Sequence, residues 1–184
     1  AALAASGIDT IDASDNAISL TVAQATALGT VNIAAGDAVT LADTGANIAA
    51  MSAAQIAALA TSGIDTIDAS DNAISLTVAQ AIALGTVTIA AGDAVTIADT
   101  GANIAAMSAA EIAALGAAGV DVIDASDDAI SLTVAQATAL GTVTIAAGDA
   151  VTLADTGANI AAMSAAQIAA LAASGIDTID ASDN

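Results

Sequence analysis

An internal repeat of 56 residues constrains this sequence more than any other feature. The segment Gly-Ile-Asp-Thr-Ile-Asp at positions 7–12 recurs at 63–68 and 175–180, and with two valine substitutions at 119–124. Three repeats fill positions 1–56, 57–112 and 113–168, and a partial repeat at 169–184 is identical to positions 1–16. Short repeating units cannot bury an apolar face alone, and they do so by stacking. We therefore interpret the chain, 1–184, as a single segment of a longer array.

Each repeat divides into two related coils, each with the order strand, tight turn, strand and helix. Val31 and Ile33 alternate with polar residues, and Val39 and Leu41 flank an outward Thr40. This alternation predicts half-buried strands on either side of a turn. Coils that follow one another without long linkers favour an α/β fold. We expect a repeat solenoid of strand–turn–strand–helix coils with two narrow parallel sheets and a layer of short helices.

The helical parts carry recognisable start and stop signals. Capping boxes at positions 21–24 and 52–55 place a hydroxyl three residues before a glutamine, which satisfies backbone N–H groups at a helix start. Gly29 and Gly63 stand where these helices should stop. We expect a short helix at 21–28 and a longer helical arm at 43–62. In this arm Asp43 is expected to cap a first turn at 45–51.

Composition excludes several classes of function. The chain has no lysine, arginine, histidine, cysteine, proline or aromatic residue, and its 20 acidic residues give a formal charge of −20. Nucleic acids and anionic membrane surfaces both require basic side chains, so neither is an expected partner. Disulfides, zinc–thiolate sites and mechanisms based on histidine or lysine are impossible. The longest apolar-leaning stretch, 46–60, is alanine-rich and interrupted by polar residues, so membrane insertion is not expected.

Catalysis is not expected either. Ser14, Ser70, Ser126 and Ser182 have no base to activate them. Paired aspartates can cleave glycosidic bonds, but the chain lacks an aromatic platform to hold a sugar. Each of these candidates also recurs in every repeat, and recurrence in every unit indicates an architectural role. We predict that the protein is not an enzyme.

The turns carry one asparagine or aspartate per coil, and stacking would align these residues in a ladder. The turn residues are Asn16, Asp37, Asn72, Asp93, Asp128, Asp149 and Asn184. Carboxylates and carbonyls at turns are the ligands that calcium prefers, so the chain has a candidate metal site. The candidate calcium ligands are Asp15, Asp37, Asp71, Asp93, Asp127 and Asp149. The alternative interpretation is that these residues form turns and keep the surface soluble.

Threonines suggest a second possible ligand, which is ice. The pairs Thr86/Thr88 and Thr142/Thr144 present a Thr-x-Thr pattern on one strand, as flat threonine arrays of ice-binding solenoids do. Aspartate interrupts the array in the intervening coils, at Asp68. Threonine is also a common outward residue of strands, so the structural interpretation is favoured.

The segments at 39–50 (Val-Thr-Leu-Ala-Asp-Thr-Gly-Ala-Asn-Ile-Ala-Ala), 53–59 (Ala-Ala-Gln-Ile-Ala-Ala-Leu) and 74–80 (Ile-Ser-Leu-Thr-Val-Ala-Gln) look like repeats of very large secreted bacterial proteins. Those proteins resemble type I secreted adhesins of the repeats-in-toxin class. The resemblance implies an extracellular or cell-surface location. This chain has no Gly-Gly-x-Gly-x-Asp nonapeptide, so the calcium site of that class is not carried over to any residue here.

Together these observations predict a structural, non-catalytic extracellular repeat protein that forms part of a stalk, surface layer or filament. Its acidic surface is expected to associate with cations, and its uncapped coils are expected to associate with one another head to tail. The alternatives are a calcium-binding adhesin module and, with less support, an ice-binding solenoid.

Overall fold

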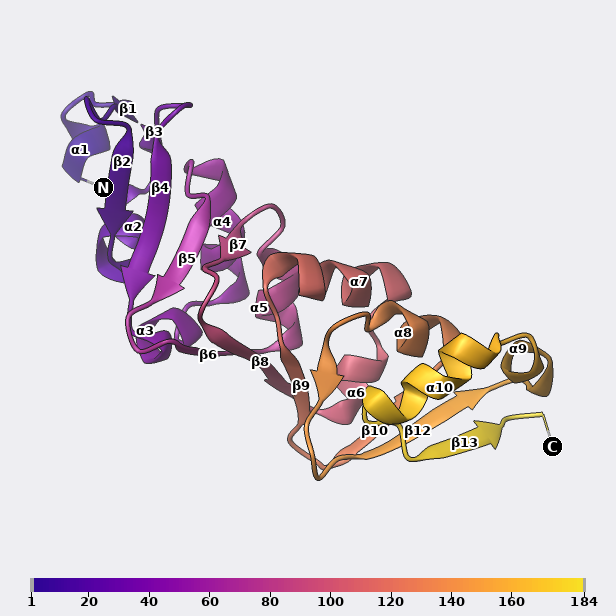
Figure 1. Ribbon diagram of the computed structural model, residues 1–184. Coiled ribbons are helices and arrows are strands. Elements are labelled where there is room, and N and C mark those ends of the chain that lie inside the picture. Colours follow the sequence, from indigo (N-terminus) through magenta and orange to yellow (C-terminus); the bar gives the residue numbers. More distant parts are fainter. Residues whose placement is uncertain (1, 184) are drawn as a thin grey trace. The chain divides into compact units, whose positions relative to one another are not determined.

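The computed structural model describes residues 2–183, with side chains from residue 4 onward, and has an α/β fold of short helices and several short parallel sheets (Figure 1). The chain divides into two compact units, and each is described by itself. The first unit comprises Ala1–Ser75 and Ala79–Ala94, and the second comprises Leu76–Val78 and Val95–Asn184. The division therefore falls inside the second repeat.

In the first unit, two parallel sheets are flanked by short helices. The strands are β1 (Thr10–Ile11), β2 (Ala17–Leu20), β3 (Asn32–Ile33), β4 (Ala38–Asp43), β5 (Thr66–Ala69) and β7 (Thr88–Ile89). The helices are α1 (Ala2–Ala5), α2 (Val22–Leu28), α3 (Gly45–Ala49) and α4 (Ala53–Thr61). Strands β1 and β3 form one sheet, and the other has the order β2-β4-β5-β7. The strand β6 (Ala73–Leu76) and the helix α5 (Val78–Ala83) lie across the division between the units.

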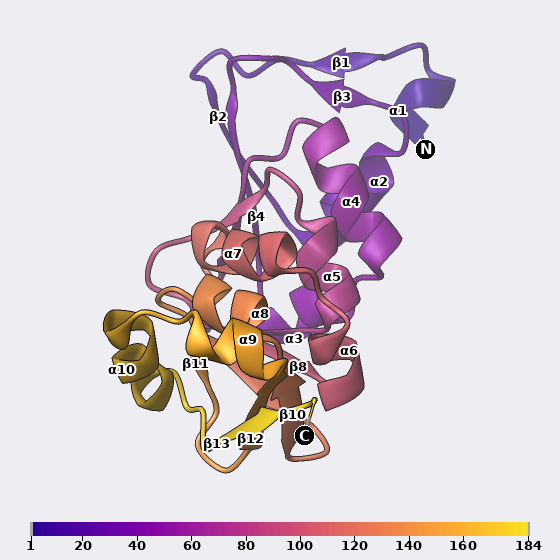
Figure 2. The ribbon, with the colours of Figure 1, turned by 90° about the vertical axis from the view of Figure 1, so that its right-hand side faces the viewer.

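The second unit repeats this pattern, and Figure 2 gives a second view of its helices and strands. Its strands are β8 (Ala94–Asp99, except for Ala94), β9 (Val122–Ala125), β10 (Ala129–Leu132), β11 (Thr144–Ile145), β12 (Ala150–Asp155) and β13 (Thr178–Ala181). Its helices are α6 (Gly101–Ala105), α7 (Ala109–Ala118), α8 (Val134–Ala139), α9 (Gly157–Ala161) and α10 (Ala165–Ala173). Strand β9 pairs in parallel with β8 and β11, and β12 pairs with β10 and β13.

The expectation of two continuous sheets is corrected, because at each repeat boundary the second strand of one coil pairs with the first strand of the next, and the sheets stay short. Strand β4 lies between β2 and β5 in one sheet, and Leu41 is opposite Leu20 on one side and Ile67 on the other. The second strand of one repeat is thus followed in the sheet by the first strand of the next. In the second unit, β12 lies in the same way between β10 and β13. We attribute this pairing to the long helical arm of the second coil: the chain leaves the arm beside Ile33 of β3, where Ser62 O accepts from Ile33 N, and β5 then pairs with β4.

The expected strand alternation is confirmed by the burial of the apolar side chains. Val31, Val39 and Leu41 are at most 1% exposed, and Ile33 is also buried. Thr40 between them is partly exposed. The first strand is shorter than expected, because β3 begins at Asn32. The isoleucines and leucines of the strands and helices therefore form the core of each unit.

The capping boxes are also confirmed. Thr21 caps α2 and Ser52 caps α4, each with a reciprocal glutamine three residues on. The expected arm at 43–62 is two helices, α3 and α4. The expectation that Asp43 caps the first of them is wrong, because the N-cap residue is Thr44, whose hydroxyl accepts a hydrogen bond from Asn47 N. Among the described helices, none is long and apolar enough to cross a membrane.

Candidate functional site

Aspartate carboxylates connect neighbouring coils throughout both units. Across the repeat boundary in the first unit, Asp65 Oδ2 accepts a hydrogen bond from Val39 N at 3.0 Å, and Asp71 Oδ1 accepts one from Gly45 N at 2.8 Å. In both cases the N–H belongs to the earlier coil and the carboxylate to the later one. We call these residues the inter-coil carboxylates. Their counterparts in the second unit are Asp121, Asp127, Asp177 and Asp183, which accept from Val95, Gly101, Val151 and Gly157.

Inter-coil carboxylates also hold the junction between the two coils of one repeat. Asp37 Oδ2 accepts from Ala13 N and Asp43 Oδ2 accepts from Val22 N, both at 3.0 Å. The other members are Asp93, Asp99, Asp149 and Asp155, which accept from Ala69, Val78, Ala125 and Val134. A carboxylate that accepts a backbone N–H makes a stronger hydrogen bond than a neutral acceptor does. At each of these junctions, a negatively charged carboxylate therefore stabilises the contact between coils through a hydrogen bond.

Asp43 and its counterpart Asp155 hold three hydrogen bonds each. The Oδ1 atom of Asp43 accepts from Thr44 N at 2.9 Å and from Asn47 Nδ2 at 2.7 Å, while Oδ2 reaches the neighbouring coil. The bond from Asn47, followed by those from Thr44 and Val22, lowers the pKa of Asp43 below its ordinary value. These groups therefore stay ionised and keep their acceptor role in mildly acidic solution.

The turn residues fall into two classes and do not form the single ladder expected. In the first coil of each repeat, Asn16, Asn72 and Asp128 adopt a left-handed backbone with φ of 54° to 56°. In the second coil a glycine takes the positive φ, and the following aspartate is buried. Asp37 and Asp93, for example, are each 8% exposed. Asparagine and aspartate tolerate the left-handed region better than other side chains do. Asn184 lies outside the described residues.

The candidate calcium ligands mostly already serve the backbone. Asp37, Asp93 and Asp149 each give one oxygen to an alanine N–H of the preceding coil. Asp71 and Asp127 each give one oxygen to a glycine N–H, and Asp15 is exposed. Between residues 2 and 183, no three acidic side chains gather closely enough to hold a metal ion. The calcium site therefore stays a prediction, and any ion there would compete with these amides or use the remaining oxygens.

The pKa of Asp149 is shifted in the opposite direction to those of Asp43 and Asp155. Burial raises the pKa of Asp149, and the charges of Asp124, Asp128 and Asp127 raise it further, against the bond from Ala125 N. This is the repeat in which Asp128 replaces the asparagine of the other two. Asn72 Nδ2 donates to Gly92 O at 3.4 Å, whereas a carboxylate at 128 has no hydrogen to donate to the equivalent carbonyl.

Sequence reasoning missed a second inter-coil contact, which glutamine makes. Gln136 Nε2 donates to Ala105 O at 2.8 Å and to Met107 O at 2.6 Å, while its Oε1 accepts from Thr133 N in the capping box. Gln80 Nε2 makes the same pair of bonds, to the carbonyls of Ala49 and Met51. One side chain thus caps its own helix and binds the preceding coil.

The two kinds of capping box differ in the residues they tolerate, and this difference was the available sequence signal. Positions 24, 80 and 136 are glutamine in every repeat, whereas the other box has Gln55, Glu111 and Gln167. Glu111 accepts from Ser108 N at 2.7 Å with no need for an amide hydrogen. Glutamate is therefore accommodated in the second box, where the cap uses only the acceptor.

Close backbone approach at the repeat boundary requires glycine. A Cβ atom at Gly45 would overlap the backbone oxygen of Ala73, and one at Gly101 would overlap that of Ala129. The N–H of the same glycine donates to the inter-coil carboxylate of the next repeat. Glycine therefore allows the two coils to come within hydrogen-bonding distance at this point.

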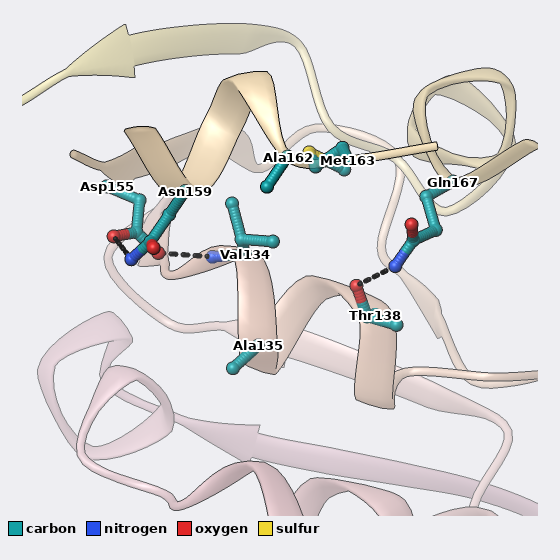
Figure 3. A pocket seen from close by; sticks show the side chains of 8 residues that line it. All are labelled: Val134, Ala135, Thr138, Asp155, Asn159, Ala162, Met163 and Gln167. Carbon is teal, nitrogen blue, oxygen red and sulfur yellow. Dashed lines mark hydrogen bonds between the residues drawn. The ribbon is translucent and has the colours of Figure 1, made fainter. Parts of the chain in front are cut away.

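A groove of about 430 Å³ lies on the helical side of the second unit (Figure 3). It is lined by Val134, Ala135, Thr138, Asp155, Asn159, Ala162, Met163 and Gln167. Asp155 is the one ionisable residue of the lining, and it accepts hydrogen bonds from Val134 N and Asn159 Nδ2. Gln167 Nε2 donates to Thr138 Oγ1 at 3.4 Å across the groove. This lining supplies neither a paired acid and base nor a nucleophile with its base.

Comparison of the chain with protein-family models, with curated proteins and with solved structures found no match.

Proposed function

We propose that this chain is a structural, non-catalytic repeat segment of an extracellular stalk, surface layer or filament, built as an α/β solenoid. Its coils stack along one direction, and each added coil extends the array without creating a new kind of site. The mechanical role follows from the stack, because pulling on the array loads parallel strands and inter-coil hydrogen bonds together.

The inter-coil carboxylates are the observation that carries this proposal. The same pairs of aspartates recur in both units, always with the carboxylate on the later coil and the N–H on the earlier one. A catalytic or ligand-binding residue needs to occur once, whereas a structural contact must occur at each junction. The recurrence therefore supports an architectural role for most of the acidic residues.

The surface charge supports an exposed setting with many small cations. A formal charge of −20 with no basic residue makes chains repel one another at low ionic strength, and salt screens that repulsion. Repulsion keeps neighbouring arrays apart sideways. Contacts along the array are supplied by backbone and carboxylate hydrogen bonds, so the charge favours end-to-end over lateral association.

The proposal is tested by the dimensions of longer arrays. Chains of three, six and nine repeats would be compared by small-angle X-ray scattering in 150 mM salt. A solenoid requires a constant cross-section and a maximum dimension that grows in proportion to repeat number. If the radius of gyration instead grew with chain length as in a compact globule, to about the 0.38 power, the proposal would be wrong.

A further inference from the structure

The helical side of the first unit carries no charge. Helices α2, α3 and α4 and residues 79–83 of α5 contain no ionisable residue. The aspartates that the structure describes in this unit all lie in strands, turns or loops, and they are Asp9, Asp12, Asp15, Asp37, Asp43, Asp65, Asp68, Asp71 and Asp93. A second copy of this acidic chain can therefore approach the helical side without bringing carboxylates together, whereas the strands and turns of two copies repel each other.

A groove of about 110 Å³ lies on this side, between α2 and α4 (Figure 2). Its apolar lining is buried, since Ala25, Met51 and Leu59 are each at most 9% exposed. Thr26 and Gln55 are exposed at its edge. The groove lies between the two coils of the first repeat. A buried apolar base with a polar edge is the kind of pocket in which a partner protein seats an apolar side chain.

The same unit presents an apolar side chain of the right kind. Ile82 on α5 is 44% exposed, and the other two repeats have threonine at this position, Thr26 and Thr138. Because α5 is the counterpart of α2, Ile82 has the place on α5 that Thr26 has on α2 at the edge of the groove. Gln80 Nε2 donates to the carbonyl of Met51 at 2.6 Å, so this part of α5 is fixed beside the helical arm that lines the groove.

We propose that two copies of this chain pair through the helical sides of their first units, with Ile82 of each copy seated in the groove between α2 and α4 of the other. Each copy supplies one isoleucine and one groove. The contact is therefore isologous and closes as a two-fold dimer. The occupant is argued from the charge of the chain, which leaves this side alone open to a second copy, and from the exposed isoleucine that the copy brings.

The pairing depends on apolar burial against a background of like charge. Moving Ile82 from water into the groove is favourable, and the dimer makes this contact twice. The net charge of each copy opposes association, and salt screens this repulsion. We therefore expect dimerisation to be tighter in 1 M salt than in 150 mM salt. The inference does not depend on the proposed function, because it concerns sideways pairing through one side of one unit.

The first test changes the isoleucine and the groove separately in the full chain. Ile82→Thr introduces the residue that the other repeats have, and Ala58→Leu places a larger side chain in the groove. Ala57→Leu is the matched control, because Ala57 is also exposed on α4 but does not line the groove. Alanine and leucine are both good helix formers, so both leucine variants should fold.

Sedimentation equilibrium in 1 M salt would measure association, with interference optics because the chain has no aromatic residue. We expect a monomer–dimer equilibrium for the original chain and for Ala57→Leu. Each lost contact should weaken dimerisation at least about tenfold, and a dimer of either other variant loses both contacts. Ile82→Thr and Ala58→Leu should therefore each dimerise at least about a hundredfold more weakly than the original chain.

The second test mixes the two weakened variants. A mixed dimer keeps one contact, in which Ile82 of the Ala58→Leu chain enters the intact groove of the Ile82→Thr chain. We expect the equimolar mixture to associate about tenfold more tightly than either variant alone and about tenfold more weakly than the original chain. A mixture that associates no more tightly than its components would overturn the seating of Ile82 in the groove.

Other results would overturn the pairing as a whole. A strict monomer in 1 M salt, or equal association of Ile82→Thr and the original chain, would contradict it. A mass that keeps rising beyond the dimer with concentration would contradict the two-fold closure. These outcomes are separate from the test of the proposed function, because scattering from covalently linked repeats reports on stacking within one chain. Elongated arrays together with monomeric chains would overturn the pairing alone.

Discussion

Coils meet at two kinds of junction, one between the two coils of a repeat and one between repeats. Both are held by carboxylates that accept backbone N–H groups, but the junction between repeats has additional contacts. Both use carboxylates that accept N–H groups from the preceding coil, such as Asp93 with Ala69 N and Asp127 with Gly101 N. The junction between repeats adds the glutamine bridge and the close approach at glycine, and there a second strand, β4, pairs with a first strand, β5. Within a repeat, β2 simply pairs with β4.

This difference teaches that the charge of the chain and its periodicity have separate causes. Carboxylate–amide bonds occur at both junctions, so they explain why aspartate is abundant. The close approach at glycine and the glutamine bridge to two backbone carbonyls are described at the junction between repeats, so they are consistent with a sequence that repeats every 56 residues and not at every coil. The glycine and the bridging glutamine of the junction between repeats should therefore be the positions most sensitive to substitution.

The largest effect is expected at the glycine of that junction. In Gly101→Ala the new Cβ would overlap Ala129 O, so the coils must separate and the Asp127 bond is lost. We expect a loss of more than about 3 kcal/mol in the free energy of unfolding, measured by urea denaturation. Gly116→Ala is the control: a Cβ there meets Val143 Cγ2 at an ordinary 3.6 Å, and the other repeats have alanine at this position. This helical change should stabilise by about 0.5–1 kcal/mol.

The next effect is expected at the glutamine bridge. Gln136→Glu keeps the acceptor for Thr133 N but places a carboxylate against the carbonyls of Ala105 and Met107. Loss of two hydrogen bonds at a side chain that is 8% exposed should cost about 2 kcal/mol in unfolding free energy. Gln55→Glu should cost less than about 0.5 kcal/mol, because that box uses only the acceptor in Glu111. Equal losses of unfolding free energy in the two variants would show that the glutamine bridge does not stabilise the junction.

A smaller effect is expected from the carboxylates, and it compares the two junctions directly. Asp93→Ala leaves the buried N–H of Ala69 without its acceptor, so we expect a loss of about 1–2 kcal/mol. Asp71→Ala at the junction between repeats removes a partly buried bond to Gly45 N and should cost less. Asp68→Ala on the exposed side of β5 is the control and should change stability by under about 0.5 kcal/mol. Thermal and urea unfolding would give the order, and a loss for Asp68→Ala as large as for Asp93→Ala would contradict it.

The smallest effect is expected at the turn in which the repeats differ. Asp128→Asn restores the side-chain donor that Asn72 has and removes one of the charges that raise the pKa of Asp149. We expect a gain of about 0.5–1 kcal/mol at pH 7. Because the pKa of Asp149 is raised in the folded chain, its ionised form is disfavoured there, and this penalty disappears as pH falls through that pKa. The gain should therefore shrink on acidification, and a gain that grew towards acidic pH would contradict this explanation.

Much of the local structure could be predicted from the sequence. The 56-residue period, the capping boxes at Thr21 and Ser52, and the inward Val39 and Leu41 depend on residues close together in the chain. The pairing of β4 with β5 could not be predicted, because it depends on where the chain leaves the helical arm.

The inter-coil carboxylates could be predicted only in part. Asp65 and Asp43 suit turns and helix starts, so their local roles hide the bonds they accept from residues 26 and 21 positions earlier. The predicted single ladder of turn residues is also wrong in part. Asn16 and Asp37 align by sequence, but they take different backbone conformations. The retention of glutamine at 24, 80 and 136 was the one signal of a long-range contact visible in the sequence.

The most direct test of the central claim, that the aspartates hold coils together as hydrogen-bond acceptors, is a set of thermal melts followed by circular dichroism. The chain would be melted in calcium, in magnesium and in chelator at matched ionic strength. We predict equal melting temperatures in calcium and magnesium, because both ions only screen the acidic surface. A rise of many degrees in calcium alone would contradict the claim, since an ion bound at defined sites stabilises the folded chain by mass action, and the turn aspartates would then be calcium ligands.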